Sequence, residues 1–528
     1  MHSSQAVNRH DAMHQEPLNL PTSGFTPHRF LQFPSWFPIG ALIAGLTCTL
    51  AYHLSYNVVD PDLWHEMALA REIIGLGHVP MLDRFAYTPT VSPSVHHEWG
   101  AGLIAFAIAQ TIGASGILFA KFAIAFGLAA LCWRGSRFNG AGIGILAFCM
   151  PLALLLMGQG FSALRAQMYS YVFVALLLTF LDKDHMGREG WWKVWLPLYV
   201  LWLNVHGGFV MGLILLGIYW VERFVVGSKH RHILLCSAVM GALVVLNPYG
   251  PAYYGYLWPA LTMPRPYVRE WGPLFSVGET WRIVAFLASF SLVAIAITIH
   301  PRWPPPRGSL LVIGTALGAL LHMRMVFFYA IVWVWYVPGY LQRTGLGAAV
   351  ERFWRGWPRF QSVFWSALAV IMVSKAIPMS PWELRVPGCP RESRSEEPVY
   401  PVGAVRYLES IQFHGNVMVH FNSGSFLLWK LFPAIRVSID GRYEVAYPPW
   451  LAEENQLLYE ARNGWQAVLE AYPTDLVLVA TRFPLARALA SLRGWTEVYA
   501  DTCFLIYARE PSALPRVRSS EPVNGKFP

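Results

Sequence analysis

The chain has 528 residues, of which 55% are hydrophobic and 13% charged, and its mean hydropathy is +0.38. Soluble domains carry about a quarter charged residues, so the composition excludes an ordinary soluble protein. The formal net charge of +9 does not indicate nucleic-acid binding, because the basic residues lie in short loops between apolar runs.

The order of polar and apolar segments predicts an α-helical polytopic membrane domain over residues 36–379. Residues 1–35 are polar and lack the apolar core of a signal peptide, so we expect a disordered cytoplasmic tail. The run 38–56 then acts as an uncleaved anchor. Further runs near membrane length are 115–133, 141–157, 166–181, 194–206, 208–226, 231–246, 281–299, 308–322, 324–341 and 360–377.

Basic residues between these runs orient the domain. They form clusters at Arg134 and Arg137; Lys183, Arg188 and Lys193; Arg223, Lys229 and Arg231; Arg302 and Arg307; and Arg343, Arg352, Arg355 and Arg359. If 38–56 runs outward and 99–112 does not cross, every cluster lies on the cytoplasmic side, as the positive-inside rule requires.

The segment 99–112 decides the topology. As a helix it would be about 21 Å long, short of the ~30 Å hydrocarbon core. We therefore expect an interfacial or re-entrant helix, about eleven crossings, and a C-terminal domain outside the membrane. Twelve crossings, with that domain in the cytoplasm, is the alternative.

Residues 57–98 form the first external loop, which is acidic. Asp62 is a suitable N-cap for a helix that ends at Gly75. Its apolar stripe, which includes Leu63 and Met67, predicts a helix lying on the membrane surface with that stripe facing the lipid. Such a helix would hold Asp60, Asp62 and His65 near the outer end of the first crossing.

The composition changes after the last crossing. Residues 380–398 are rich in Pro, Arg, Ser and Glu and predict a linker. Residues 399–512 predict an external α/β domain, with strands near 415–421, 436–440, 476–480 and 495–508 and helices between them. Residues 513–528 are expected to be a disordered tail. The domain shows no motif of independent chemistry, and a Cys389–Cys503 disulfide is permitted there.

In the eleven-crossing topology, several ionisable residues that are costly to bury in a membrane lie on the same outer side. Arg165, His206 and Arg324 lie at the ends of apolar runs, where ionisable groups commonly serve a function. Each has a plainer interpretation: the arginines could snorkel to the interface, and His206 could be packed at a helix end. Asp60 and Asp62 could be helix caps, and His65, His96 and His97 solvated loop residues. Their convergence on one face favours a site.

The chain resembles bacterial polytopic proteins of the GT-C glycosyltransferase superfamily from residue 38 onward. The motifs that carry the resemblance are Asp60-x-Asp62-x-x-His65, Val79-Pro80-x-x-Asp83-x-Phe85-x-Tyr87-Thr88, His97-Glu98-Trp99, Arg165-Ala166-Gln167, Trp202-x-Asn204-x-His206-Gly207, Asn247-Pro248-Tyr249-Gly250 and Ile439-Asp440-Gly441-Arg442.

The resemblance implies that an acidic residue in the first external loop, here Asp60 or Asp62, is catalytic, and that the donor is a sugar on a polyprenyl phosphate. Protein mannosyltransferases of this superfamily show adjacent Asp-Glu, whereas Pro61 separates the two carboxylates here. This departure argues against protein O-mannosylation and leaves the general class in place.

The same chemistry follows from the residue types. A carboxylate can take the proton of an attacking hydroxyl, so Asp60 and Asp62, with His65, are the predicted catalytic residues. Arg165, Arg324 and His206 can hold the leaving phosphate, and His97 and Glu98 are further predicted substrate-binding residues. Asp60 and Asp62, with His65 as a further ligand, could also hold a divalent cation such as Mg²⁺ or Mn²⁺.

We therefore expect a glycosyltransferase of the bacterial cytoplasmic (inner) membrane that uses a polyprenyl-phosphate-linked sugar and an envelope acceptor. The alternative is a non-catalytic protein, either a glycolipid transporter or a scaffold with a partner-binding C-terminal domain. Paired broken helices from internal repeats, which transporters often show, are not visible in the sequence.

Overall fold

The computed structural model describes residues 36–161, 163–188, 190–263, 265, 268–276, 278–299, 306–388, 398–510, 513–520 and 523–528, without the side chains of Gln159 and Glu444. The predicted N-terminal tail and residues 389–397 of the predicted linker lie outside this description. Cys389 is among them, so its disulfide with Cys503 stays a prediction.

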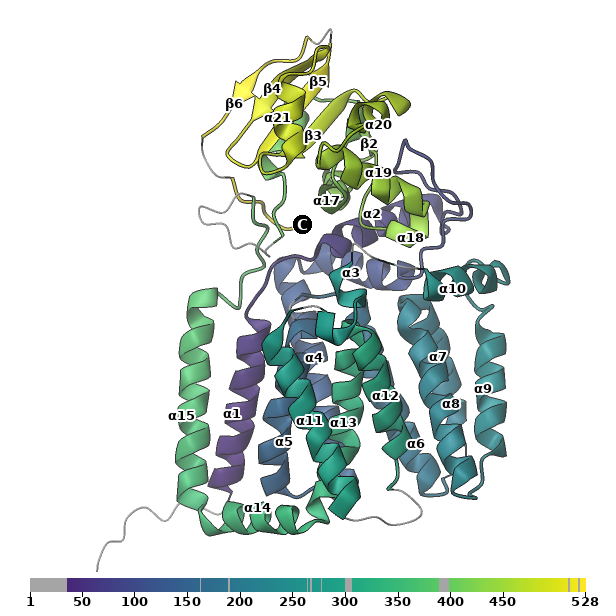
Figure 1. Cartoon of the computed structure of the whole chain (residues 1–528), viewed down its shortest axis with the longest axis vertical. Coiled ribbons are helices and arrows are strands. Elements are labelled where there is room, and N and C mark those ends of the chain that lie inside the picture. The colour runs from purple at the N-terminus through teal and green to yellow at the C-terminus, as the bar shows by residue number, and fades with distance from the viewer. Residues whose placement is uncertain are drawn as a thin grey trace, which may run out of the picture.

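A bundle of helices forms the larger part of the molecule (Figure 1). Its members are α1 (Phe37–Leu54), α4 (Ala114–Phe138), α5 (Ile143–Met157), α6 (Gln167–His185), α7 (Trp192–Val205), α8 (Val210–Val225), α9 (Arg231–Leu243), α11 (Thr280–Ile299), α12 (Ser309–Leu321), α13 (Val326–Gln342) and α15 (Pro358–Ala376). Among the described residues, 6 helical stretches are long and apolar enough to cross a membrane. The count of about eleven crossings stays a prediction.

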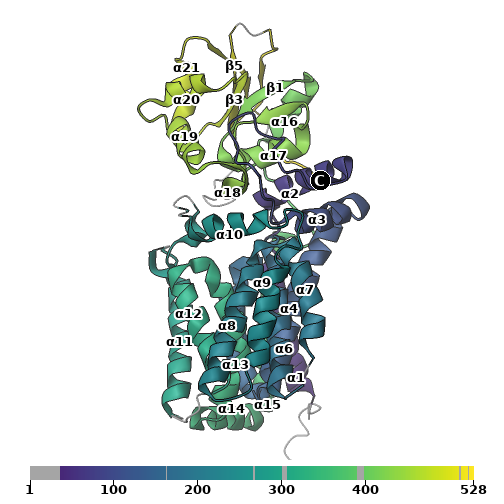
Figure 2. The same cartoon turned by 90° about the vertical axis from the view of Figure 1, so that its right-hand side faces the viewer.

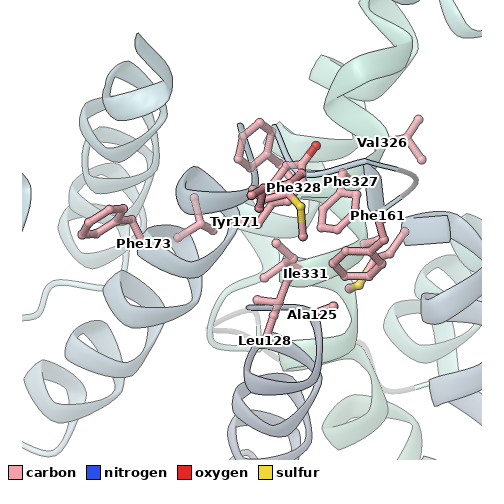
Figure 3. Close-up of a cluster of buried hydrophobic side chains, with 14 of the residues drawn as sticks. Ala125, Leu128, Phe161, Tyr171, Phe173, Val326, Phe327, Phe328 and Ile331 are labelled. Atoms are coloured by element: carbon pink, nitrogen blue, oxygen red, sulfur yellow. The ribbon is translucent and has the colours of Figure 1, made fainter. Parts of the chain in front are cut away.

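Helix α13 forms the core of the bundle. The stretch Met323–Gln342 is 89% buried, whereas Pro358–Met379 is only 17% buried and exposes apolar side chains outward. At the start of α13, Phe327 stacks on Tyr171 of α6 with ring centroids 3.5 Å apart, and Phe161 packs against the edge of the same Phe327 ring (Figure 3). This packing fixes the starts of α6 and α13, beside which Arg165 and Arg324 emerge.

Three helices lie across the end of the bundle that faces the C-terminal domain: α2 (Pro61–Leu76), α3 (Trp99–Thr111) and α10 (Ala252–Thr262) (Figures 1 and 2). Helix α14 (Gly345–Gly356) lies across the opposite end. The segment predicted not to cross, 99–112, thus forms a 13-residue helix outside the row of bundle helices.

The prediction for α2 is wrong in two respects. Its N-cap is Asp60, whose side chain accepts a hydrogen bond from the Asp62 amide, so the helix begins one residue before Asp62. Most of its apolar stripe does not face lipid either, because Leu63, Met67 and Ala70 are buried within the protein, whereas Ile74 at the end of the stripe is 60% exposed. The C-terminal domain covers this helix: Trp64 meets Phe426 of α17 (Phe421–Leu431) edge to face at 5.2 Å.

The C-terminal domain contains a 6-stranded sheet in the order β2-β1-β3-β5-β4-β6. Strands β1 (Gly415–Met418), β2 (Ile435–Val437) and β3 (Leu476–Ala480) are parallel, while β4 (Trp495–Ala500) and β5 (Phe504–Arg509) form an antiparallel pair that joins β3 through β5. In register, Val417 pairs with both Val437 and Leu476. The helices of the domain are α16 (Val402–Ser410), α17, α18 (Tyr443–Ala446), α19 (Pro449–Tyr459), α20 (Trp465–Ala471) and α21 (Pro484–Ala490).

The segment predicted as a disordered tail, 513–528, is ordered where the structure describes it. Strand β6 (Val517–Arg518) pairs with β4, and Gly525 forms a bridge with Val386. Phe527 packs against Trp64 with ring centroids 5.5 Å apart. The apolar contact and the backbone pairing outweigh the polar composition on which the prediction was based.

A buried ion network joins the C-terminal domain to the loop 57–98. The guanidinium of Arg442 binds both Asp440, in its own turn, and Asp83 of the loop. Tyr447 donates a hydrogen bond to Asp440 at 2.6 Å. Since these charged side chains are almost fully buried, each requires the others to offset its loss of hydration.

Candidate active site

A cavity of about 520 Å³ lies between the bundle and the C-terminal domain. Its lining includes seven of the eight residues predicted from the sequence, namely Asp62, His65, His97, Glu98, Arg165, His206 and Arg324. The eighth, Asp60, lies directly behind the lining and binds Arg165. Segments far apart in the sequence therefore converge here.

The two predicted catalytic aspartates differ in their surroundings. Both oxygens of Asp60 are engaged: Oδ1 accepts from the Asp62 amide at 3.0 Å, and Oδ2 accepts from Nε of Arg165. Asp62 instead lines the cavity. Burial, and next the negative charge of Asp60, raise the pKa of Asp62 well above its usual range, although Arg165 opposes this rise. Asp62 is therefore a stronger base than an ordinary aspartate.

A second pair of carboxyl groups lies beside them. Burial raises the pKa of Glu66, and the charge of Glu98, to which Glu66 is hydrogen-bonded, raises it further. Burial alone would also raise the pKa of Glu98, but hydrogen bonds from His206 and His97 hold it well below its usual range. The surroundings therefore shift the pKa values of Glu66 and Glu98 in opposite directions, with Glu66 favouring the protonated form and Glu98 the ionised form. Glu66 was not predicted, although it lies one helical turn after Asp62 on the same face of α2.

His206 is fixed as a neutral donor to Glu98. Oγ of Ser170 accepts a hydrogen bond from Trp202 Nε1 at 2.7 Å and lies 2.7 Å from Nδ1 of His206. The Gly208 amide donates to the same Nδ1 at 2.8 Å. The ring hydrogen is therefore on Nε2, which lies 3.2 Å from Oε1 of Glu98. Burial lowers the pKa of His206, which favours this neutral form.

His96 and His97 do not behave as the solvated loop residues of the plainer interpretation. His97 contacts Glu98 through Nε2 at 3.5 Å, and its Nδ1 lies 2.8 Å from the hydroxyl of Tyr256 on α10. His96 is buried, and its backbone amide donates to Tyr249 of the Asn247-Pro248-Tyr249-Gly250 motif at 2.9 Å.

Another part of the cavity lining is basic and aromatic. The guanidinium carbons of Arg265 and Arg324 lie 4.1 and 4.4 Å from the ring centroid of Trp271. Glu270 approaches Arg165 at 3.6 Å and Arg324 at 4.0 Å. Gln167 accepts a hydrogen bond from Arg324 at 3.2 Å. A planar guanidinium group can donate two parallel hydrogen bonds to the oxygens of one phosphate, so this part of the lining suits a phosphate.

Sequence reasoning missed Arg265, Glu270 and Trp271. They follow α10 in a segment without any motif, and they become relevant only because the fold brings them against Arg165 and Arg324.

The C-terminal domain supplies another wall. Phe421 and Asn422 follow β1, Gly441 and Tyr443 follow β2, and all of them line the cavity. Ligands of open α/β sheets bind outside the carboxyl ends of parallel strands, which is the edge that this domain presents. A Cβ atom on Gly441 would lie 3.2 Å from Oδ1 of Asp62 and 3.3 Å from Nδ1 of His65, so the turn fits closely against α2.

The surroundings of Asp60 and Asp62 offer few free ligands for the predicted divalent cation. Within the described parts of the chain, no group of three or more His, Cys, Asp or Glu side chains is arranged to hold a metal ion. Asp60 already uses one oxygen for an amide and the other for Arg165. A divalent cation at Asp60 and Asp62 therefore stays a prediction.

Several solved structures share this architecture. The apo oligosaccharyltransferase of Archaeoglobus fulgidus matches with a TM-score of 0.57 and 12% identity, over 92% of this chain and 76% of that one. ArnT from Cupriavidus metallidurans bound to undecaprenyl phosphate matches with a TM-score of 0.50 and 14% identity, over 91% of this chain and 99% of that one. The archaeal enzyme in complex with Zn and sulfate matches with a TM-score of 0.51 and 12% identity, over 89% of this chain and 73% of that one.

No protein-family model and no curated protein matches this chain. The solved structures are glycosyltransferases of the GT-C superfamily, and the likeness extends over the bundle and the C-terminal domain alike. The chain therefore has the fold of the GT-C glycosyltransferase superfamily.

Proposed function

We propose that the protein is a membrane glycosyltransferase that moves a sugar from a polyprenyl-phosphate donor to a hydroxyl group of an envelope acceptor. The observation that carries the proposal is one cavity whose lining holds a carboxylate of raised pKa, Asp62, together with Arg165 and Arg324. The solved complex of ArnT with undecaprenyl phosphate supports a polyprenyl phosphate as the donor carrier.

In the proposed reaction, Asp62 accepts the proton of the acceptor hydroxyl as its oxygen attacks the anomeric carbon of the sugar. The bond between that carbon and the phosphate oxygen breaks, and the polyprenyl phosphate leaves as an anion. Arg165 and Arg324 stabilise the leaving phosphate. Asp60 orients Arg165 through their ion pair, so it links the basic and acidic sides of the cavity.

The wall from the C-terminal domain favours an acceptor whose reacting end is uncharged. The side chains that this wall contributes to the cavity lining include the aromatic rings of Phe421 and Tyr443, which meet edge to face at 6.1 Å, and the amide of Asn422. Arg442 also reaches the cavity, but Asp440 and Asp83 already neutralise its charge. A hydroxyl group on a glycan or a neutral lipid fits this wall.

A transfer assay tests the proposal. Purified protein in nanodiscs is incubated with radiolabelled sugars on polyprenyl phosphate, with envelope lipids as acceptors, both with and without a chelator. We expect labelled product from at least one donor, formed roughly 100-fold more slowly or slower still by the Asp62→Asn variant. Transport of the lipid-linked sugar across vesicles without product would instead support the non-catalytic alternative.

A further inference from the structure

The histidine of the first motif, His65, is hydrogen-bonded to the C-terminal domain. Its Nδ1 lies 3.3 Å from Oγ of Ser425 in α17. Both side chains are buried, at 8% and 1% exposure. Ser425 belongs to none of the motifs that indicate this site in the sequence.

The direction of this hydrogen bond follows from a third group. The backbone amide of Gly441 donates to Oγ of Ser425 at 3.1 Å. Within the described part of the chain, Gly441 and His65 are the groups hydrogen-bonded to this hydroxyl. If Nδ1 of His65 carried a hydrogen, the hydroxyl would accept from both groups, and its own buried hydrogen would have no acceptor between them. The hydroxyl therefore donates and Nδ1 accepts.

The three groups are held rigidly. A Cβ atom on Gly424 would lie 2.0 Å from the carbonyl oxygen of Ile439, so α17 packs directly on the turn that carries Gly441. Asp440 and Arg442 flank that turn and are joined by an ion pair of 2.6 Å. The amide of Gly441 therefore has little freedom to move away from Ser425.

We propose that Ser425 is a positioning residue of the active site, which holds His65 in the neutral tautomer with its hydrogen on Nε2. His65 then acts as a hydrogen-bond donor toward the substrates in the cavity, and not as a base. The charged groups around the ring are Asp440, Arg442, Glu98 and Asp60, and burial is the largest influence, which lowers the pKa of His65 to about 4. The spectroscopic part of this proposal is independent of the proposed function, whereas the kinetic part rests on it.

The first experiment needs no donor. The tautomer of His65 is measured at pH 7 by nitrogen NMR of the full-length protein, labelled with ¹⁵N-histidine, in nanodiscs. The His65→Gln variant assigns the signal. We expect the Nε2–H form in the wild type, in Ser425→Thr and in Ser423→Ala, a matched control on the same helix, and a changed signal in Ser425→Ala. An Nδ1–H form in the wild type, or an unchanged signal in Ser425→Ala, overturns the proposal.

The second experiment uses the donor found in the transfer assay. Ser425→Ala should lower kcat by about 10-fold, the loss of one hydrogen bond at the site, without changing the KM of the donor. In a His65→Gln background it should cause no further loss, and Ser425→Thr should restore most of the rate. Equal losses in both backgrounds, or a Ser425→Thr variant as slow as Ser425→Ala, overturn the kinetic role. If the wild type uses no donor, the proposed function fails, and the NMR measurement still decides the tautomer.

Discussion

Asp60 and Asp62 are separated by one residue and yet have different partners. Asp60 caps α2 and binds Arg165, while Asp62 lines the cavity. We expect Asp62→Asn to lower the transfer rate by roughly 100-fold or more, because the variant removes a general base. Donor binding should be kept. The measurement is single-turnover transfer with equal donor occupancy, and a fully active Asp62→Asn variant would contradict the assignment.

Asp60→Asn should change the pH dependence of the same reaction. A base acts when deprotonated, so activity rises with pH through the pKa of Asp62, which burial and the charge of Asp60 raise. Removing the charge of Asp60 lowers that pKa, and the acidic limb of kcat/KM should therefore move to lower pH. An acidic limb that moves to higher pH, or that does not move, would exclude Asp62 as the titrating base.

The arginines can be tested separately from the aspartates. Arg324→Lys keeps the charge but loses the planar pair of donors, so we expect weaker binding of a polyprenyl phosphate, and weaker still in Arg324→Ala and Arg165→Ala. Binding to each purified variant is measured directly, with Arg462→Ala on the exposed surface as the control. Unchanged binding in all three would leave Arg324 with a packing role on Trp271.

Glu270 lies between Arg165 and Arg324, the two arginines that we assign to the phosphate. It is carried by the short helix η3 (Arg269–Trp271), and its distances to Arg165 and Arg324, 3.6 and 4.0 Å, are longer than those of a tight ion pair. We expect Glu270→Gln to tighten binding of undecaprenyl phosphate severalfold, because a negative charge beside the incoming phosphate is removed. Titration of the lipid into both proteins measures it, and weaker binding would mean that Glu270 instead orients the arginines.

The turn that carries Arg442 fixes the C-terminal domain to the loop 57–98. Replacing Arg442 by Ala leaves the negative charges of Asp440 and Asp83 buried without their cationic partner, which should cost about 3–5 kcal/mol. We expect a lower thermal midpoint and faster proteolysis of the C-terminal domain, with Arg462→Ala again as the control. A midpoint equal to that of the wild type would mean that the domain docks through its apolar contacts alone.

The elements also show where sequence patterns are sufficient. Strand β3 was predicted with its observed bounds, since a short run of buried branched residues flanked by turns has few other solutions. The apolar stripe on α2 was recognised, but its partner was not, because packing against α17 and contact with lipid both favour an apolar helix face. Ser425 and Glu270 carry no local signal, and only the folded arrangement places them at the site.

For the whole molecule, the predicted orientation has a direct test. A reporter enzyme that is active only outside the cytoplasm is fused after Arg509, and a second fusion after Trp357 follows α14, at the opposite end of the bundle. We expect activity from the first fusion and none from the second, because the basic loops favour the cytoplasmic side. The reverse result would place the cavity on the cytoplasmic face.

The polytopic class and the GT-C fold could be predicted because hydropathy and the spacing of several motifs act over most of the chain. The predicted site residues were found together because they are ionisable groups beside apolar runs, either in the first external loop or at the ends of later runs, where such groups are costly unless a site needs them. What remained hidden is the contribution of the C-terminal domain, whose wall residues, such as Asn422 and Tyr443, are ordinary in any loop.

The contacts of Trp64 have a consequence for biogenesis. Trp64 is synthesised early, because it lies near the N-terminus of the chain. Its ring packs against Tyr400, Phe426 and Phe527, which are synthesised much later. During synthesis, the inserted helices therefore present an unsatisfied aromatic face beside the nascent acidic loop. A chain released after α15 would keep the bundle helices but lack the aromatic partners of Trp64. We therefore expect such a truncated product to be inactive.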